Sequence, residues 1–173
     1  MKATILIISS IFLLSFATFP ALKKQPAKNH IEQYIERYLK TAQTEARLYN
    51  IPVSITLAQG IIESNCGRSS LAKKHNNHFG VKWHKGRKEK FAVYRDDTPT
   101  DRFVVYKSAW WSYRDHSRLL TSKHYRHLTK LKRTDYKNWA KGLKKCGYAT
   151  HPKYAQILIS VIEKNKLWRY DLK

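Results

Sequence analysis

The residue with the clearest potential for chemistry is Glu63. It follows Ile61 and Ile62 at the end of an apolar segment with helical spacing. Burial disfavours the charged form of a carboxyl, and the negative end of a helix repels an anion, so Glu63 is expected to hold its proton unusually well. A general acid requires that property. A helix-end glutamate that is hydrogen-bonded to nearby backbone is the alternative interpretation.

A second group of carboxyls follows in a different element. Most of the twelve acidic residues fit solvated helix surfaces, helix caps or the exposed chain end, with Glu45 and Asp171 among them. The cluster that remains consists of Asp96, Asp97 and Asp101. In glycoside hydrolysis one carboxyl protonates the leaving oxygen, and another carboxylate orients water or stabilises positive charge. Glu63 and this cluster could divide those two tasks.

The elements that must position these acids follow from the apolar pattern. Apolar residues recur at intervals of three and four, which predicts helices. The helices are predicted over 30–50 and 52–63 and from Ser108, Asp135 and Pro152. Alternation at 91–93 and 103–105 predicts a β-hairpin that carries the aspartates at its turn. The expected fold is α+β, a mainly helical domain with a small β-hairpin lobe.

Three tryptophans, Trp83, Trp110 and Trp111, lie near these predicted elements. Flat aromatic faces can stack on sugar rings, and Trp83 is a candidate for that role. Trp110 and Trp111 are neighbours in a predicted helix and cannot both point inward. At least one of these two is expected to pack in the core.

The beginning of the chain has the composition of an export segment. Residues 1–19 hold an apolar run after Lys2, which predicts a signal peptide or a short membrane anchor. Residues 20–29 read as a linker, and 30–173 as one domain. The domain is therefore expected in the periplasm or outside the cell. Membrane contact is expected only if the segment stays uncleaved.

The chain is strongly cationic, with 34 Lys and Arg against 12 Asp and Glu, a net charge of +22. Such a field attracts polyanions, among them nucleic acid, anionic lipid and an acid-bearing cell wall, while a solvated lysine-rich surface explains much of the charge as well. Predicted export favours the anionic cell wall as partner, and no specific nucleic acid is expected.

Cys66 and Cys146 are the only cysteines. A disulfide between them would close a loop of about 80 residues, worth roughly 4–5 kcal/mol. An oxidising compartment favours this pairing, with two free thiols as the alternative. Two histidine pairs have the spacing of helical metal ligands, but neither has a clear acid or cysteine partner, so no metal site and no cofactor is predicted.

Four separated stretches resemble the glucosaminidase branch of the lysozyme-like peptidoglycan hydrolases, which includes flagellar-rod and autolysin glucosaminidases. The stretches are Gln59-Gly60-Ile61-Ile62-Glu63-Ser64, Asn76-Asn77-His78-Phe79-Gly80-Val81-Lys82, Ser112-Tyr113-Arg114-Asp115-His116, and Gly147-Tyr148-Ala149-Thr150 followed by Tyr154. They occur in the family's order over about residues 30 to 172. The resemblance implies a lysozyme-like fold, in which the mainly helical domain and the small β-hairpin lobe flank a substrate cleft.

The resemblance also implies roles for single residues. Glu63 would be the general acid that protonates the oxygen between N-acetylglucosamine and N-acetylmuramic acid, and Tyr148 the family's active-site tyrosine. Asn77, Phe79 and Gly80 would line or shape the groove in which the protein holds a peptidoglycan strand. The family's second acid is usually a glutamate ahead of a phenylalanine and a tyrosine. Asp101 matches that place with a shorter side chain, and Asp97 or Asp96 could substitute for it.

Three other functions remain as alternatives. A lytic transglycosylase would use a similar Glu-Ser pair, but it normally carries a Gly-Leu-Met-Gln type segment where this chain has residues 79–82, Phe-Gly-Val-Lys. A muramidase would cut the other sugar linkage. A noncatalytic cationic wall-binding module would fit the charge and the aromatic content, yet it would leave the four stretches unexplained.

Overall fold

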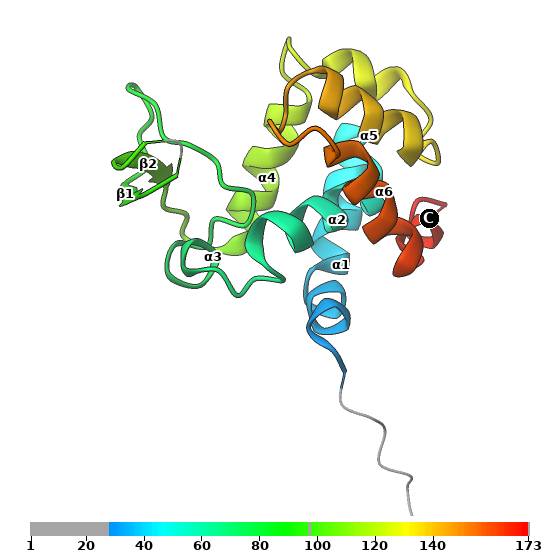
Figure 1. Cartoon of the computed structure of the whole chain (residues 1–173), viewed down its shortest axis with the longest axis horizontal. Coiled ribbons are helices and arrows are strands. Elements are labelled where there is room, and N and C mark those ends of the chain that lie inside the picture. Colours follow the sequence, from blue (N-terminus) through cyan, green and yellow to red (C-terminus); the bar gives the residue numbers. More distant parts are fainter. Residues whose placement is uncertain (1–27, 97, 173) are drawn as a thin grey trace, which may run out of the picture.

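The computed structural model describes residues 28–172 except residue 97. The predicted signal or anchor (1–19), most of the predicted linker (20–29) and Asp97 therefore lie outside the described residues. The elements are α1 His30–Tyr49, α2 Val53–Ser64, α3 Ser70–His75, β1 Phe91–Tyr94, β2 Asp101–Val104, α4 Ala109–Leu120, η1 Arg126–Lys130, α5 Tyr136–Lys145, α6 Tyr154–Lys164 and η2 Leu167–Tyr170. The predicted α+β class is confirmed: helices form the body, and one hairpin stands beside them (Figure 1).

The first helix begins and ends at residues with clear physical reasons. Asn29 caps α1, because its side chain accepts hydrogen bonds from Ile31 N and Glu32 N while Glu32 reaches back to the Asn29 N–H. This reciprocal pair satisfies backbone donors that the first helical turn leaves free. Asn50 ends the helix in the left-handed conformation, with φ 54°.

The second helix, α2, runs through the centre of the body and is buried on all sides over Val53–Ile61. Its first turn binds Asp171, whose carboxylate accepts from Ser54 N at 2.8 Å and from Ser54 Oγ at 2.7 Å. A helix N-terminus favours an anion at this position. The expectation that Asp171 is exposed is therefore wrong: its exposed fraction is 3%.

The end of α2 is abrupt, because three consecutive residues take positive φ. Asn65, Cys66 and Gly67 have φ values of 49°, 57° and 74°. The chain cannot continue as a helix through this conformation, so it turns away. Glu63 is left in the last helical turn, where the body meets the lobe.

The lobe is the antiparallel hairpin β1–β2, in which Phe91 pairs with Val104 and Tyr94 with Asp101. It is fastened to the body through Asp115 on α4. Tyr106 Oη donates to Asp115 at 2.6 Å, and Arg87 Nη2 lies 2.5 Å from the same carboxylate. One carboxylate thus holds two segments that flank the hairpin.

Two further expectations about burial are wrong. Trp110 and Trp111 are both exposed, at 38% and 44%. Glu45, expected on a solvated face, has an exposed fraction of 0% and pairs with Arg114, whose Nε lies 3.0 Å from Glu45 Oε2. The ion pair compensates the buried charge.

The predicted disulfide is not formed, and both cysteines are free thiols. Cys66 follows α2 beside Tyr34, whereas Cys146 ends α5 with its Sγ 3.6 Å from His127 Nε2. The two thiols have different neighbours, so the pairing does not arise from this packing. Within residues 28–172, residue 97 aside, no helix combines the length and the apolar composition that a bilayer crossing requires.

Candidate active site

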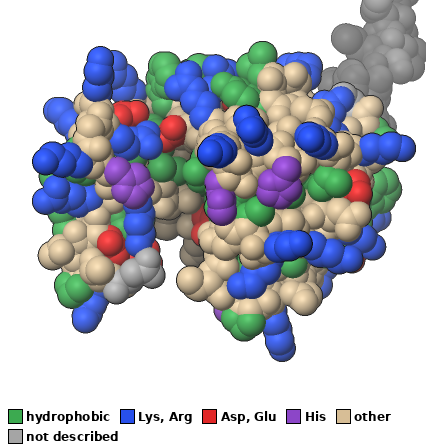
Figure 2. Space-filling model, turned by 90° about the horizontal axis from the view of Figure 1, so that it is seen from above, with side chains coloured by type: hydrophobic (Ala, Val, Ile, Leu, Met, Phe, Trp, Pro, Cys, Tyr) green, Lys and Arg blue, Asp and Glu red, His purple; other side chains and the backbone are tan. Residues whose placement is uncertain are grey.

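A large hollow separates the lobe from the helical body. It has a volume of about 1080 Å³, and its walls come from the end of α2, the loop after α3, the hairpin, α4 and the segment before α6. Figure 2 shows this hollow between the smaller and the larger part of the molecule, with Lys and Arg side chains around it. The space is of the size that proteins use to bind small molecules or segments of a polymer.

Glu63 opens onto this hollow from the last turn of α2. Although Glu63 is exposed to the hollow, the protein around its carboxyl displaces part of the water, and this desolvation raises the pKa of Glu63 above its ordinary value. A hydrogen bond from Tyr154 Oη to Glu63 Oε1, 3.3 Å long, acts in the opposite direction, and the charge of Asp96 raises the pKa further. The raised pKa has the direction that the sequence predicts.

Tyr154 connects Glu63 to a buried chain of polar groups. Gln59 Nε2 donates to Tyr154 Oη at 3.0 Å, and Gln59 Oε1 lies 3.2 Å from His116 Nε2. Since Gln59 uses its amide N–H toward Tyr154, its carbonyl oxygen accepts from His116, which must carry its proton on Nε2. The chain runs from His116 through Gln59 and Tyr154 to Glu63.

His116 is uncharged at the buried end of this chain. Its exposed fraction is 0%, and burial lowers its pKa to about 3. The ring stacks on Phe79 with centroids 3.9 Å apart. Its Nδ1 has no partner, which agrees with an Nε2–H tautomer that has an unprotonated Nδ1. A neutral imidazole orients Gln59 without adding a charge near Glu63.

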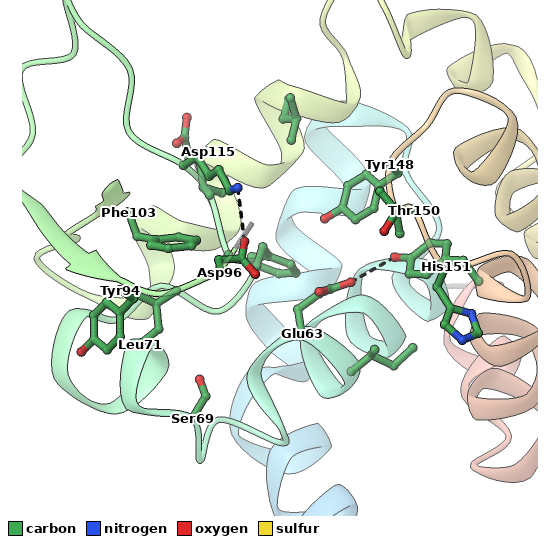
Figure 3. Close-up of a pocket in the computed structure, with 18 of the residues that line it drawn as sticks. Glu63, Ser69, Leu71, Tyr94, Asp96, Phe103, Asp115, Tyr148, Thr150 and His151 are labelled. Carbon is green, nitrogen blue, oxygen red and sulfur yellow. Dashed lines mark hydrogen bonds and ion pairs between the residues drawn. The ribbon is translucent and has the colours of Figure 1, made fainter. Parts of the chain in front are cut away.

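The acids of the lobe differ in where they point. Asp96 lines the hollow and forms an ion pair with Lys82 at 3.2 Å. Figure 3 shows Asp96 on the lobe side facing Glu63. Asp101 is not among the lining residues; its Oδ2 accepts from Thr98 N at 2.8 Å and lies 3.4 Å from Lys82 Nζ. These donors lower the pKa of Asp101, with the Thr98 N–H the largest cause.

Three of the other predicted site residues line the hollow. Tyr148, Phe79 and Gly80 line the hollow, and Tyr148 stacks on Tyr154 with centroids 5.8 Å apart. Gly80 has φ 62°, a conformation that favours glycine. Figure 3 shows Tyr148 on the body side, opposite the lobe.

Two predicted residues do not reach the hollow. Asn77 has an exposed fraction of 1%, and its amide bonds Val81 O and Val104 O at 3.0 Å each, so it braces the loop against the lobe. Trp83 packs on Phe91 with centroids 4.9 Å apart and donates to a backbone carbonyl. The described residues contain no group of three or more His, Cys, Asp or Glu side chains arranged to hold a metal ion.

Sequence reasoning missed the supporting chain of Gln59, Tyr154 and His116. Gln59 carried a usable signal, because it lies four residues before Glu63 and therefore on the same face of α2. No comparable local signal marks His116, since its partner is 57 residues away in the sequence.

A sequence profile described as mannosyl-glycoprotein endo-beta-N-acetylglucosaminidase, the glucosaminidase family, matches residues 39–167. Among curated proteins, the exo-glucosaminidase LytG of Bacillus subtilis is 35% identical over 150 residues, which cover 80% of this chain and 52% of LytG. The chain thus spans about half the length of that relative.

Two solved structures share the fold over most of both chains. The catalytic domain of the autolysin Auto from Listeria monocytogenes matches with a TM-score of 0.69 and 28% identity, covering 87% of this chain and 91% of that domain. A peptidoglycan hydrolase from Sphingomonas sp. A1 matches with a TM-score of 0.70 and 26% identity, covering 82% and 93%. The predicted lysozyme-like architecture is confirmed by these neighbours.

Proposed function

The chain belongs to the glucosaminidase family, and from that premise we propose that it hydrolyses peptidoglycan within the strand, at the β-1,4 bond between N-acetylglucosamine and N-acetylmuramic acid, with Glu63 as general acid. The observation that carries this proposal is the placement of Glu63: a carboxyl with a raised pKa opens onto a hollow of about 1080 Å³. A carboxyl in this state can protonate the bridging oxygen and release the leaving sugar.

The second carboxylate of the proposal is Asp96. It lines the hollow, faces Glu63 from the lobe, and its charge is near enough to influence the Glu63 proton. Its task would be to stabilise the positive charge that develops on the sugar ring or to orient the group that attacks it. Asp101 would instead shape the turn through Thr98 and share Lys82 with Asp96.

Tyr148 would contact the sugar from the body side. Its ring lines the hollow and is held against Tyr154, which also bonds Glu63. An aromatic ring at this place offers an apolar face to a sugar and a hydroxyl to its polar groups. The predicted export and the cationic surface both fit a substrate that lies in an anionic wall outside the membrane.

The test is Glu63→Gln, assayed on purified sacculi. We expect wall-lytic activity to fall by at least about 10²–10⁴-fold, the usual contribution of a general acid. The matched control is Glu163→Gln, because Glu163 also accepts from a tyrosine hydroxyl, Tyr136 Oη at 3.2 Å, but on the exposed surface. Unfolding by heat should be similar in both variants. Undiminished lysis by Glu63→Gln would reject the proposal.

The products identify the bond that is cut. Reduction of the digest followed by mass spectrometry should show N-acetylglucosamine at the new reducing ends. Anhydro ends would indicate a transglycosylase, and reducing N-acetylmuramic acid a muramidase. Release of single sugars from strand ends would indicate exo cleavage. Binding to sacculi without any product would favour a noncatalytic module.

A further inference from the structure

A second hollow, of about 680 Å³, lies between the lobe and α4. One side is formed by the segments 88–90 and 105–107, which flank the hairpin, and the other by α4 residues between Trp111 and Arg118. Asp115 and Arg118 line this hollow and also the main one. The two hollows are therefore neighbours that share part of a wall.

The acids of the second hollow are already neutralised. Glu89 Oε1 lies 3.2 Å from Arg87 Nη2, and Asp115 binds the same guanidinium. Arg114 is likewise used by the buried Glu45. The other charged side chains around this hollow are positive: Arg118, whose charge lowers the pKa of Glu89, and three lysines.

Three lysines provide that positive charge. In the part of the chain that the structure describes, the side chains of Lys88, Lys90 and Lys107 form no ion pair and no hydrogen bond. All three are exposed. Unpaired cations around a hollow attract an anionic ligand.

Trp111 adds an apolar face to the same hollow. It is 44% exposed and lines the hollow, while Trp110 does not. Trp110 is held by Arg114, whose guanidinium carbon lies 4.6 Å from the ring centroid, and its ring is nearly perpendicular to Trp111 at 82°. The exposed Trp111 ring is therefore available to an apolar part of a ligand in this hollow.

We propose that the second hollow binds the peptide branch of the glycan strand whose sugars occupy the main hollow. This inference rests on the proposed function. The carboxylates of the branch would meet Lys88, Lys90 and Lys107, and its apolar side chains would pack on Trp111. The shared wall at Asp115 and Arg118 places the two hollows within reach of one branched substrate.

The test measures binding and so does not depend on catalysis. The full chain carrying Glu63→Gln is titrated, by calorimetry, with two probes: a muramoyl-peptide oligosaccharide and the same oligosaccharide freed of peptide by an amidase. The test variant adds Lys88→Ala and Lys107→Ala. The control adds Lys141→Ala and Lys145→Ala, which remove the same charge from exposed positions of α5.

We expect the Lys88→Ala and Lys107→Ala pair to weaken binding of the peptide-bearing probe about tenfold, a change of about 1.4 kcal/mol. Binding of the peptide-free probe should stay as it is in the Glu63→Gln parent, and the control pair should leave both affinities unchanged. Trp111→Ala should weaken the peptide-bearing probe in the same selective way.

Three results would overturn the inference. Equal affinities of parent and test variant for the peptide-bearing probe would show that the hollow takes no peptide. Equal weakening of both probes would show that it binds sugar, and a matching loss in the control pair would show a general charge effect. Since the proposed function is judged by lysis, its failure and the failure of this inference are recognised separately.

Discussion

The substitution Tyr154→Phe tests the chain of polar groups behind Glu63, because it removes one hydroxyl and little else. Gln59 Nε2 donates to that hydroxyl at 3.0 Å, and Gln59 has an exposed fraction of 0%. The variant leaves a buried amide N–H without an acceptor, which costs about 1–3 kcal/mol. We expect the free energy of unfolding to fall by about that amount, as measured by urea denaturation.

The same substitution changes the proton affinity of Glu63. The Tyr154 hydroxyl donates to Glu63 Oε1 at 3.3 Å and favours the anion, so its loss raises the pKa of Glu63 further. A general acid acts in its protonated form, and activity declines as the pH rises through its pKa. The alkaline limb of kcat/KM for wall lysis should therefore move to higher pH.

Tyr136→Phe is the matched control for both measurements. Its hydroxyl donates to Glu163 Oε1 at 3.2 Å, but the pair is exposed. Its unfolding free energy should stay within about 0.5 kcal/mol of the parent, with an unchanged pH profile. The reasoning is refuted if Tyr154→Phe also keeps the stability and the alkaline limb of the parent protein.

Two predictions concern buried charges. Desolvation raises the pKa of Asp171 to about 6, so its contribution to stability is present below about pH 4 and is lost as the pH rises through 6, about 3 kcal/mol in all. In Asp171→Asn the fall in unfolding free energy between pH 4 and 7 should shrink by that amount; an equal fall in both proteins would contradict it. Arg114→Ala leaves Glu45 buried without its partner and should cost about 3–5 kcal/mol in urea unfolding. Lys137→Ala, at an exposed pair, should cost no more than about 1 kcal/mol, and equal costs for both substitutions would count against the burial argument.

The sequence predicted the elements well because their signals are local. Apolar spacing and capping residues located α1 and α2, and alternation located the hairpin. The burial of Glu45 and Asp171 escaped prediction because each is buried by contacts with a distant segment: Arg114 lies 69 residues from Glu45, and Ser54 lies 117 residues from Asp171. Periodicity within one helix carries no information about such partners.

The site residues show the same difference between local signals and contacts with distant segments. Glu63 could be singled out from its own helix, where an apolar run and a helix end act on one carboxyl. The resemblance pointed to Asp101 as the second acid, with Asp97 or Asp96 as substitutes, but in the structure Asp96 lines the hollow and Asp101 does not. Local sequence carries no sign of this difference, because it depends on which carboxylate accepts from the Thr98 N–H in the turn. The wrong expectation that Trp110 or Trp111 packs in the core has a similar origin: Trp111 lines a hollow that α4 forms together with the segments on either side of the hairpin.

The attachment of the lobe has a consequence for turnover. Glu63 belongs to the body and Asp96 to the lobe, and the carboxylate of Asp115 fastens the lobe to α4 through Tyr106 and Arg87. Under the proposed function, movement at this attachment changes both the binding of the glycan strand and the alignment of the Glu63 and Asp96 carboxyls. Weakening the contacts of Asp115 with Tyr106 and Arg87 should therefore lower both substrate affinity and catalytic rate, as happens when a hinge residue is altered.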